Sequence, residues 1–339
     1  MEKARFKWVL RERNRKIAAK TEAFTEQQAR RVRSFHSSFK EYSPTPLIEL
    51  TSLAQHLGIK NLFVKDESYR FGLNAFKVLG GSFAIGSYIA NELGEDIDDL
   101  PYMRLVSDEV RSLLGSKTFI TTTDGNHGRG VAWTANRLKQ QAIVYMPQGS
   151  AAERLSNIRA EGAQAEITDM NYDDTVRYTS ELAQKNGWII VQDTAWDGYT
   201  RIPLWIMQGY MTMALEAYEQ LPVKPTHIFL QAGVGSLAGS VQGFFADIYG
   251  SSCPLTFIVE PKGADCLYQT AAANDGSLHS VTGRLETIMA GLACGEPNSI
   301  AWEILGNLSD GFISCPDYTA AQGMRILGNP LAGDTKVSA

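Results

Sequence analysis

Short hydrophobic runs alternate with stretches of helical periodicity along most of the chain. Runs of apolar, mostly β-branched and aromatic residues predict strands at 62–65, 119–122, 142–146, 165–168, 188–192, 228–231 and 256–260. Between most of them, apolar residues recur every three or four positions and predict helices at 128–138, 152–161, 173–185, 204–220, 237–249 and 264–273. This alternation predicts an α/β fold with parallel sheets, and with ligand-binding loops at the carboxyl ends of the strands.

The composition permits a large core and argues against two kinds of partner. The chain has 339 residues, of which 44% are hydrophobic, a size typical of two domains. Its net charge of -5 does not favour nucleic acid, and no apolar run is long enough for a membrane span. The cysteines lack the C-x-x-C spacing of metal sites. We expect no secretory leader and a cytoplasmic protein with reduced thiols; a Cys266 to Cys294 bridge is the alternative.

The first forty residues differ from the rest of the chain. Lysine and arginine are dense in this segment, but glutamates at positions 2, 12, 22 and 26 interrupt them. A transit peptide is normally poor in acids. We therefore expect a solvated helical arm or a subunit contact at 1–40.

Lys77 stands near the start of a further predicted helix, in the segment 74–77 (NAFK), with Asn74 as a candidate N-cap. The positive end of a helix disfavours an ammonium, so we expect a neutral, nucleophilic amine, as a Schiff base requires. Taken alone, Lys77 is better explained as a solvated surface lysine; the motifs that accompany it favour the functional role.

A loop that reads TDGNHG at 123–128 follows the strand 119–122. Its glycines free backbone amides for a carboxylate, and Asn126 can donate a hydrogen bond to a phenolic oxygen. Structural roles are also open: Asp124 as an N-cap, Asn126 as a turn former and His127 as a core histidine. The density of such residues favours a binding loop.

A second loop, GVGSLA at 233–238, joins the strand 228–231 to a helix of small residues. Such a turn gathers N–H groups around an anion. The loop also fits the dinucleotide fingerprint, with Glu260 placed to bind a ribose. A third interpretation is that its glycines only allow close packing of helix and sheet. A lysine, an amide loop and an anion loop together match pyridoxal phosphate, an aldehyde with an anionic tail.

Four segments resemble, in order and spacing, the fold type II pyridoxal phosphate enzymes, which include tryptophan synthase β and the serine and threonine dehydratases. They are 64–67 (VKDE), 74–77 (NAFK), 124–128 (DGNHG) and 233–236 (GVGS). Three longer runs, at 71–77, 191–199 and 289–295, most resemble the diaminopropionate ammonia-lyases. Their reaction converts D- or L-2,3-diaminopropionate to pyruvate and ammonia.

The resemblance implies a role for each motif residue. Lys77 would hold the cofactor, Phe76 would flank its ring and Asn126 would lie near its 3′ oxygen. The phosphate would be bound by Gly233, Val234, Gly235, Ser236 and Leu237. The amino-acid substrate would contact Thr123, Gly125 and His127.

Asp124 stands where the dehydratases carry a serine, and it suggests a second base. Lys77 reaches one face of the cofactor and so serves only one enantiomer, which we take to be the L isomer; Asp124 on the other face would serve the D isomer. Asp193, after the strand 188–192, is our candidate for holding the leaving β-amino group. A turn or N-cap role for Asp193 is the alternative.

The family also implies a domain plan. A large cofactor-binding domain would comprise 41–86 and 188–339, with a small domain inserted at 87–187, the cofactor in the cleft, and a homodimer. The family continues past the position of Ala339 with the segment that holds the partner of the pyridine nitrogen. We expect a chain that ends there to expose a hydrophobic face and to have poor activity.

Three other functions stay open. The first is a serine or threonine dehydratase of the same fold. The others are a NAD-dependent dehydrogenase that uses the loop 233–238, and a catalytically inactive binding protein.

Overall fold

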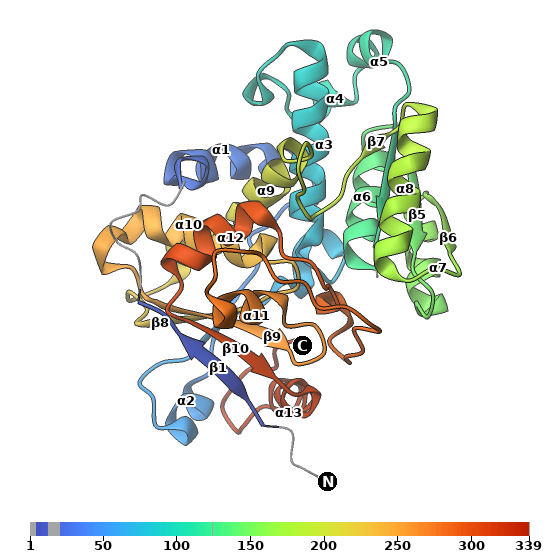
Figure 1. Cartoon of the computed structure of the whole chain (residues 1–339). Helices are drawn as coiled ribbons and strands as arrows, with labels where there is room; N and C mark the ends of the chain where they lie inside the picture. The colour runs from blue at the N-terminus through green and yellow to red at the C-terminus, as the bar shows by residue number, and fades with distance from the viewer. Residues whose placement is uncertain (1–4, 13–20, 124, 339) are drawn as a thin grey trace.

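Two four-stranded sheets and a small two-stranded sheet organise the computed structural model, which describes residues 5–12, 21–123 and 125–338 (Figure 1). The strands are β1 (Lys7–Leu10), β2 (Leu47–Glu49), β3 (Phe63–Lys65), β4 (Thr118–Thr122), β5 (Gln141–Met146), β6 (Gln164–Ile167), β7 (Ile189–Ile190), β8 (His227–Gln231), β9 (Leu255–Pro261) and β10 (Gly311–Cys315). The helices are α1 (Glu26–Ser37), α2 (Thr51–Leu57), α3 (Lys77–Leu93), α4 (Tyr102–Leu105), α5 (Asp108–Leu114), α6 (Asn126–Arg137), α7 (Ala152–Ala160), α8 (Tyr172–Asn186), α9 (Arg201–Gln220), α10 (Ser236–Tyr249), α11 (Cys266–Ala273), α12 (Ser299–Leu308) and α13 (Asp317–Gly328).

The predicted parallel sheets are present. One sheet has the order β6-β5-β4-β7 and is parallel throughout. The other has the order β1-β10-β9-β8, in which β1 alone is antiparallel. The strand predicted at 62–65 forms as β3, but its expected place in a parallel sheet is wrong. Strand β3 pairs antiparallel with β2 and joins neither large sheet.

The two large sheets draw on different parts of the chain. The strands β4 to β7 all lie within 118–190, and α6, α7 and α8 accompany them on the right of Figure 1. The other sheet lies at the lower left, below α10 and α12. The exact division at 41–86, 87–187 and 188–339 stays a prediction.

Helix α3 is held tightly between α9 and α6, just after Lys77. A Cβ added to Gly209 of α9 would lie 2.4 Å from the carbonyl oxygen of Leu79. One added to Gly130 of α6 would lie 2.8 Å from Cα of Val78. Glycine at both positions therefore allows the close approach that fixes the first turn of α3.

The expectation of a solvated N-terminal arm is wrong for much of 1–40. Helix α1 buries Ala29, Val32 and Phe35 and packs against α9, because its apolar residues share one face. Strand β1 extends a large sheet. Residues 1–4 and 13–20 lie outside the described part of the chain, and the predicted subunit contact stays a prediction.

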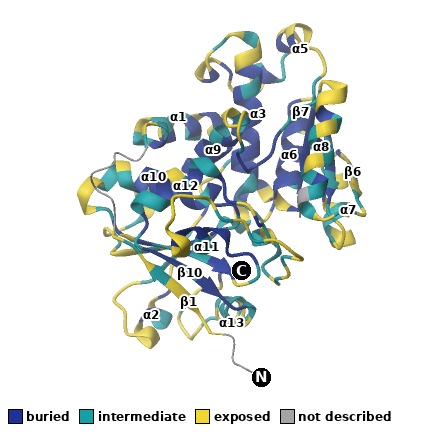
Figure 2. Cartoon of the chain, viewed as in Figure 1, coloured by how far each residue is buried: buried dark blue, intermediate teal, exposed yellow. Residues whose placement is uncertain are grey.

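The sheet that contains β1 carries exposed hydrophobic side chains. Figure 2 colours β1 largely as exposed. Leu10 pairs with Gly311, which pairs with Phe257, which pairs with Phe229, so these residues form one row across the face. Leu10 is 69% exposed and Phe229 is 62% exposed.

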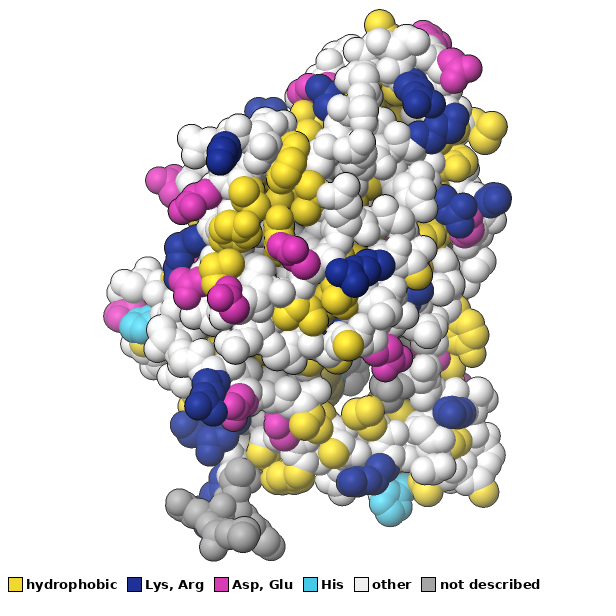
Figure 3. Space-filling model, turned by 90° about the vertical axis from the view of Figure 1, so that its right-hand side faces the viewer, with side chains coloured by type: hydrophobic (Ala, Val, Ile, Leu, Met, Phe, Trp, Pro, Cys, Tyr) yellow, Lys and Arg dark blue, Asp and Glu magenta, His cyan; other side chains and the backbone are white. Residues whose placement is uncertain are grey.

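Another face of the molecule mixes all side-chain types. In Figure 3, acidic and basic side chains are interspersed, and hydrophobic side chains gather between them. Within the described ranges, we find no helix that combines the length and the apolar character needed to span a bilayer.

Candidate active site

Three helices begin at the predicted binding loops. Helices α3, α6 and α10 start at Lys77, Asn126 and Ser236, and no described side chain caps their first turns. Uncapped N–H groups at a helix N-terminus suit a bound anion. The expectation that Asn74 caps α3 is wrong, because Phe76 occupies the cap position and Asn74 adopts a left-handed φ of 56°.

Lys77 and Asp193 form an ion pair in which Nζ of the lysine donates to Oδ2 of the aspartate. Their side chains are 22% and 8% exposed, so the pair is largely shielded from water. The lysine comes from the start of α3, whereas the aspartate follows β7, 116 residues later in the chain. The structure therefore brings together two of the three predicted catalytic residues.

The ion pair sets the charge of Lys77. Burial by itself lowers the pKa of Lys77, but the charge of Asp193 and its hydrogen bond raise that pKa above the usual range of a lysine. Burial raises the pKa of Asp193, yet the charge of Lys77 outweighs it and the pKa falls to about 2. The expected neutral amine is therefore wrong for this state, because the carboxylate outweighs the helix terminus.

Asp193 is held by the loop that is predicted to bind phosphate. The hydroxyl of Ser236 donates to the main-chain oxygen of Asp193 at 2.6 Å, and Nδ2 of Asn298 donates to that hydroxyl at 2.8 Å. Asn298 is fully buried and also caps α12 with its side-chain oxygen. Sequence analysis missed Asn298, although an asparagine before a helical run is an N-cap signal.

Gln192 ties the end of β7 to the neighbouring strand β4. Its Nε2 donates to the carbonyl oxygen of Thr122 at 3.0 Å and to the hydroxyl of Tyr172 at 2.9 Å. Its Oε1 accepts from the backbone N–H of Thr122 at 3.0 Å. Since Gln192 is 1% exposed, these bonds satisfy a buried amide and fix the chain next to Asp193. Sequence analysis gave Gln192 no role beyond the end of a strand.

The loop after β4 is shaped by its own side chains. The hydroxyl of Thr123 accepts from the N–H of Gly125 at 2.9 Å, and Nε2 of His127 donates to the carbonyl oxygen of Val191 at 2.7 Å. Thr123 and His127 are buried, whereas Asn126 is exposed. Asp124, the proposed second base, lies outside the described residues.

The glycine loop after β8 forms a concave turn. Gly235 has a φ of 101°, which glycine adopts without strain, and a Cβ on Gly233 would lie 3.3 Å from Sγ of Cys294. Glu260 is not placed to bind a ribose, because its buried carboxylate accepts from the N–H groups of Leu267 and Tyr268 at 2.9 and 2.7 Å. The dinucleotide interpretation of this loop thus loses its acidic residue.

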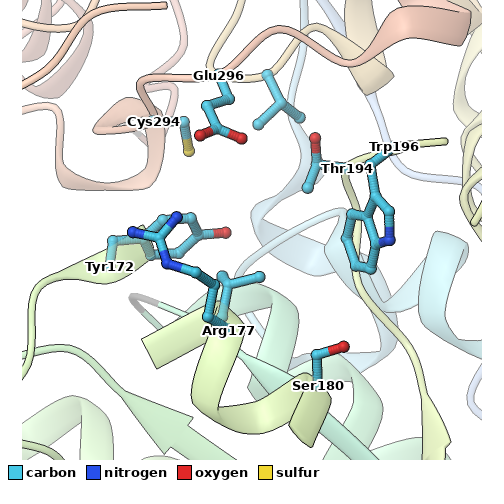
Figure 4. Close-up of a pocket in the computed structure, with 9 residues that line it drawn as sticks. Tyr172, Arg177, Ser180, Thr194, Trp196, Cys294 and Glu296 are labelled. Carbon is cyan, nitrogen blue, oxygen red and sulfur yellow. The ribbon is translucent and has the colours of Figure 1, made fainter. Parts of the chain in front are cut away.

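A cavity of about 240 Å³ opens beside these loops (Figure 4). It is lined by Tyr172, Val176, Arg177, Ser180, Thr194, Trp196, Val234, Cys294 and Glu296. In Figure 4, Tyr172 and Arg177 of α8 face Cys294 and Glu296 across the space. Sequence analysis did not find Tyr172, Arg177 or Glu296, which carry no local motif. Cys266 and Cys294 are not joined in a disulfide, as expected.

The site fits pyridoxal phosphate. Lys77 supplies an amine. At Gly233 and Gly235 the absence of a Cβ lets the turn pack closely against Cys294 and Ala301, 3.3 Å from where a Cβ would lie. A buried hydroxyl, that of Tyr210, has no hydrogen-bond partner among the residues that the structure describes. A lysine that can form an imine and a glycine turn at a helix N-terminus that can bind a phosphate are what this cofactor requires.

Comparison with known proteins identifies the family. The model of the family "Pyridoxal-phosphate dependent enzyme" matches residues 39–330. The chain is 53% identical, over 89% of its length and 76% of the relative's, to a diaminopropionate ammonia-lyase of Salmonella typhimurium. The corresponding Escherichia coli protein is 52% identical over 93% of this chain and 78% of its own length.

Solved structures agree with the sequence comparison. The holo diaminopropionate ammonia-lyase of Escherichia coli superposes with a TM-score of 0.90 and 49% identity, over 98% of this chain and 82% of that one. A threonine deaminase of Solanum lycopersicum superposes with a TM-score of 0.73 at 18% identity, over 98% of this chain and 84% of that one, and so shows the fold alone. The chain therefore belongs to the pyridoxal-phosphate dependent enzyme family, with the fold type II architecture that its sequence predicts.

Proposed function

We propose that this chain is a pyridoxal phosphate-dependent ammonia-lyase that converts D- and L-2,3-diaminopropionate to pyruvate and ammonia. The observation that carries the proposal is its 52% identity to the Escherichia coli diaminopropionate ammonia-lyase. The alternative, a threonine dehydratase, is favoured less, since such an enzyme of Staphylococcus aureus is 26% identical over 84% of the chain.

Lys77 and the loop 233–237 would hold the cofactor. When bound, pyridoxal phosphate supplies an aldehyde for the substrate amine and a ring that withdraws electrons from the α carbon. Lys77 takes the α proton of the L isomer, and Asp124 takes that of the D isomer. The role of Asp124 is supported by its position in the loop motif, where the dehydratases carry a serine.

Asp193 would hold the leaving β-amino group. While it is paired with Lys77, the pKa of Asp193 is lowered to about 2 and its carboxylate is ionised. An ionised carboxylate attracts a cation and favours the protonated form of a neighbouring amine. Glu296 places a further acidic side chain in the wall of the nearby cavity. Two acidic groups favour a substrate with a second amine over serine, whose side chain is neutral.

We also propose a homodimer in the cytoplasm, which light scattering and cell fractionation can test. Substrate contacts by Thr123, Gly125 and His127, and contacts of Phe76 and Asn126 with the cofactor, belong to the same proposal. Asn126 is exposed and the neighbouring His127 is buried. The side-chain amide of Asn126 is therefore accessible to a cofactor, which supports its proposed contact.

The decisive experiment assays keto-acid release from D- and L-diaminopropionate, serine and threonine with the pyridoxal phosphate-loaded protein. We expect pyruvate from both isomers of diaminopropionate at a far higher kcat/KM than from serine, and no product with Lys77→Ala. Borohydride trapping followed by mass spectrometry should find the cofactor on Lys77. Faster turnover of serine or threonine would establish the dehydratase instead. Trapped cofactor without any ammonia release would establish a binding protein.

A further inference from the structure

Tyr210 is a fully buried tyrosine with an unsatisfied hydroxyl. It lies in α9 and is 0% exposed, and its oxygen has no hydrogen-bond partner in the described part of the chain. A buried hydroxyl without a partner is costly, so native proteins seldom keep one unless another state of the site satisfies it. The hydroxyl of Tyr210 therefore needs a partner that this arrangement does not supply.

The tyrosine ring packs against the first turn of α3, on both sides of Lys77. It meets Phe76 edge to face, with centroids 5.2 Å apart and planes at 75°. At Gly80 an added Cβ would lie 2.7 Å from Cε1 and 2.9 Å from Cζ of the ring. Phe76 precedes Lys77, and Gly80 lies about one helical turn after it. The phenol thus occupies the space beside Lys77 that the absence of a side chain on Gly80 leaves open.

The two charge states of Lys77 need different partners. The ammonium form only donates hydrogen bonds, and in this structure it donates to the carboxylate of Asp193. A neutral amine has a lone pair that needs a donor, and an ionised carboxylate cannot supply one. The nearby hydroxyl of Ser236 already donates to the main-chain oxygen of Asp193.

We propose that Tyr210 is a positioning residue that donates its hydroxyl hydrogen to Nζ of Lys77 when the lysine is neutral. Asp193 then holds the ammonium and Tyr210 holds the amine, so the lysine alternates between two defined partners. Burial raises the pKa of Tyr210, which keeps the hydroxyl protonated and able to donate. The inference deepens the proposed function, because Lys77 must become neutral to attack the cofactor.

A donor to the neutral form stabilises that form. Replacing Tyr210 with phenylalanine removes only the hydroxyl, so we expect the pKa of Lys77 to rise. At any pH below that pKa the fraction of neutral amine falls by a constant factor, about three- to tenfold for one neutral hydrogen bond. The reactivity of Lys77 should then recover as the pH rises.

The test uses the cofactor-free protein. Competitive labelling of lysines with acetic anhydride, followed by mass spectrometry, gives the rate at Lys77 as a function of pH. Tyr218→Phe is the matched control, because Tyr218 lies on the same helix and packs edge to face against Phe244 and Tyr249. Melting temperatures of both variants verify the fold. Tyr210→Met, which also lacks a donor, replaces Tyr210→Phe if that variant melts well below the wild type.

A slower rate at Lys77 in Tyr210→Phe, with the pH profile moved upward and Tyr218→Phe unchanged, supports the proposal. If folded Tyr210→Phe gives the same labelling rates at Lys77 as the wild type at every pH, the proposal is overturned. Attachment of pyridoxal phosphate, followed by absorbance, separates this failure from failure of the proposed function. That step joins Nζ to the aldehyde carbon with loss of one water. Wild-type protein that forms no such bond refutes the proposed function, whereas the labelling profile decides the role of Tyr210 by itself.

Discussion

The hydroxyl of Ser236 donates a hydrogen bond of 2.6 Å to the main-chain oxygen of Asp193. One residue begins the helix after the glycine loop, and the other pairs with Lys77. The bond therefore couples the proposed phosphate site to the proposed site of proton transfer. Movement of either loop would disturb the other.

Ser236→Ala tests this coupling. Loss of the hydroxyl leaves Nδ2 of Asn298 and the carbonyl oxygen of Asp193 without this partner, which should cost about 1–3 kcal/mol of unfolding free energy. The Kd for pyridoxal phosphate should rise about tenfold. The control is Ser240→Ala on the same helix, whose buried hydroxyl donates to the carbonyl oxygen of Met207 at 2.6 Å. Urea unfolding and absorbance titration should show similar stability losses but a raised Kd for Ser236→Ala alone; equal Kd values would disprove the coupling.

Asp124→Asn tests the second base. Asparagine keeps the size but cannot accept a proton, so kcat/KM for D-diaminopropionate should fall about a hundredfold or more, with the L isomer changed only a few-fold. Steady-state assays of pyruvate release measure both isomers. The exposed Asp169→Asn should leave both rates unchanged. Equal losses for the two isomers would remove the two-base hypothesis.

Arg70→Met should be strongly destabilising. Nη1 and Nη2 of Arg70 donate to the two carboxylate oxygens of Glu216 at 2.8 and 2.7 Å, and both side chains are 1% exposed. Removing the arginine leaves the buried Glu216 with Lys65 as its remaining cationic partner, which should cost about 3 kcal/mol. Urea unfolding measures the loss, and Arg30→Met, which breaks an exposed pair with Glu26, should change little. A loss for Arg70→Met no larger than that of the control would contradict the prediction.

His36 should make stability depend on pH. Burial, helped by the charge of Arg70, lowers the pKa of His36 to about 3, whereas an unfolded histidine titrates near about 6.5. Between these values the unfolded chain binds the extra proton, so this contribution to stability is complete above about pH 6.5 and declines as the pH falls. The slope from His36 approaches about 1.4 kcal/mol per pH unit in that window.

Urea unfolding between pH 5 and pH 7 measures this slope. His36→Gln should flatten it even though the variant is less stable, because it loses the bond between Nδ1 and the hydroxyl of Thr212 at 2.7 Å. His279→Gln, at a half-buried histidine, serves as the control and should keep the wild-type slope. An unchanged slope in His36→Gln would assign the pH dependence to other groups.

Much of the fold follows from local sequence patterns. The order of strands and helices and the parallel sheets follow from hydrophobic periodicity, because the apolar positions within each element show which of its faces is buried. Two of the three unpredicted strands show the limit of that signal. Strand β10 contains glycine, serine and cysteine, and β1 lies in a charged segment, so neither reads as an apolar run. Sequence analysis identified the segment 64–67 only as a family motif. In the structure, Lys65 and Glu67 belong to the buried ion network of Arg70 and Glu216.

The sequence by itself determined the kind of site: Lys77 at a helix start and two glycine-bearing loops, since a lysine, glycines and their spacing are local features. Tertiary structure alone decided which groups meet. It placed Asp193 against Lys77, turned Glu260 into a helix cap and left the hydroxyl of Tyr210 without a partner among the described residues. These contacts join residues far apart in the chain, and no local pattern encodes them. They arise only when helices and sheets pack, and packing then sets burial, charge and pKa.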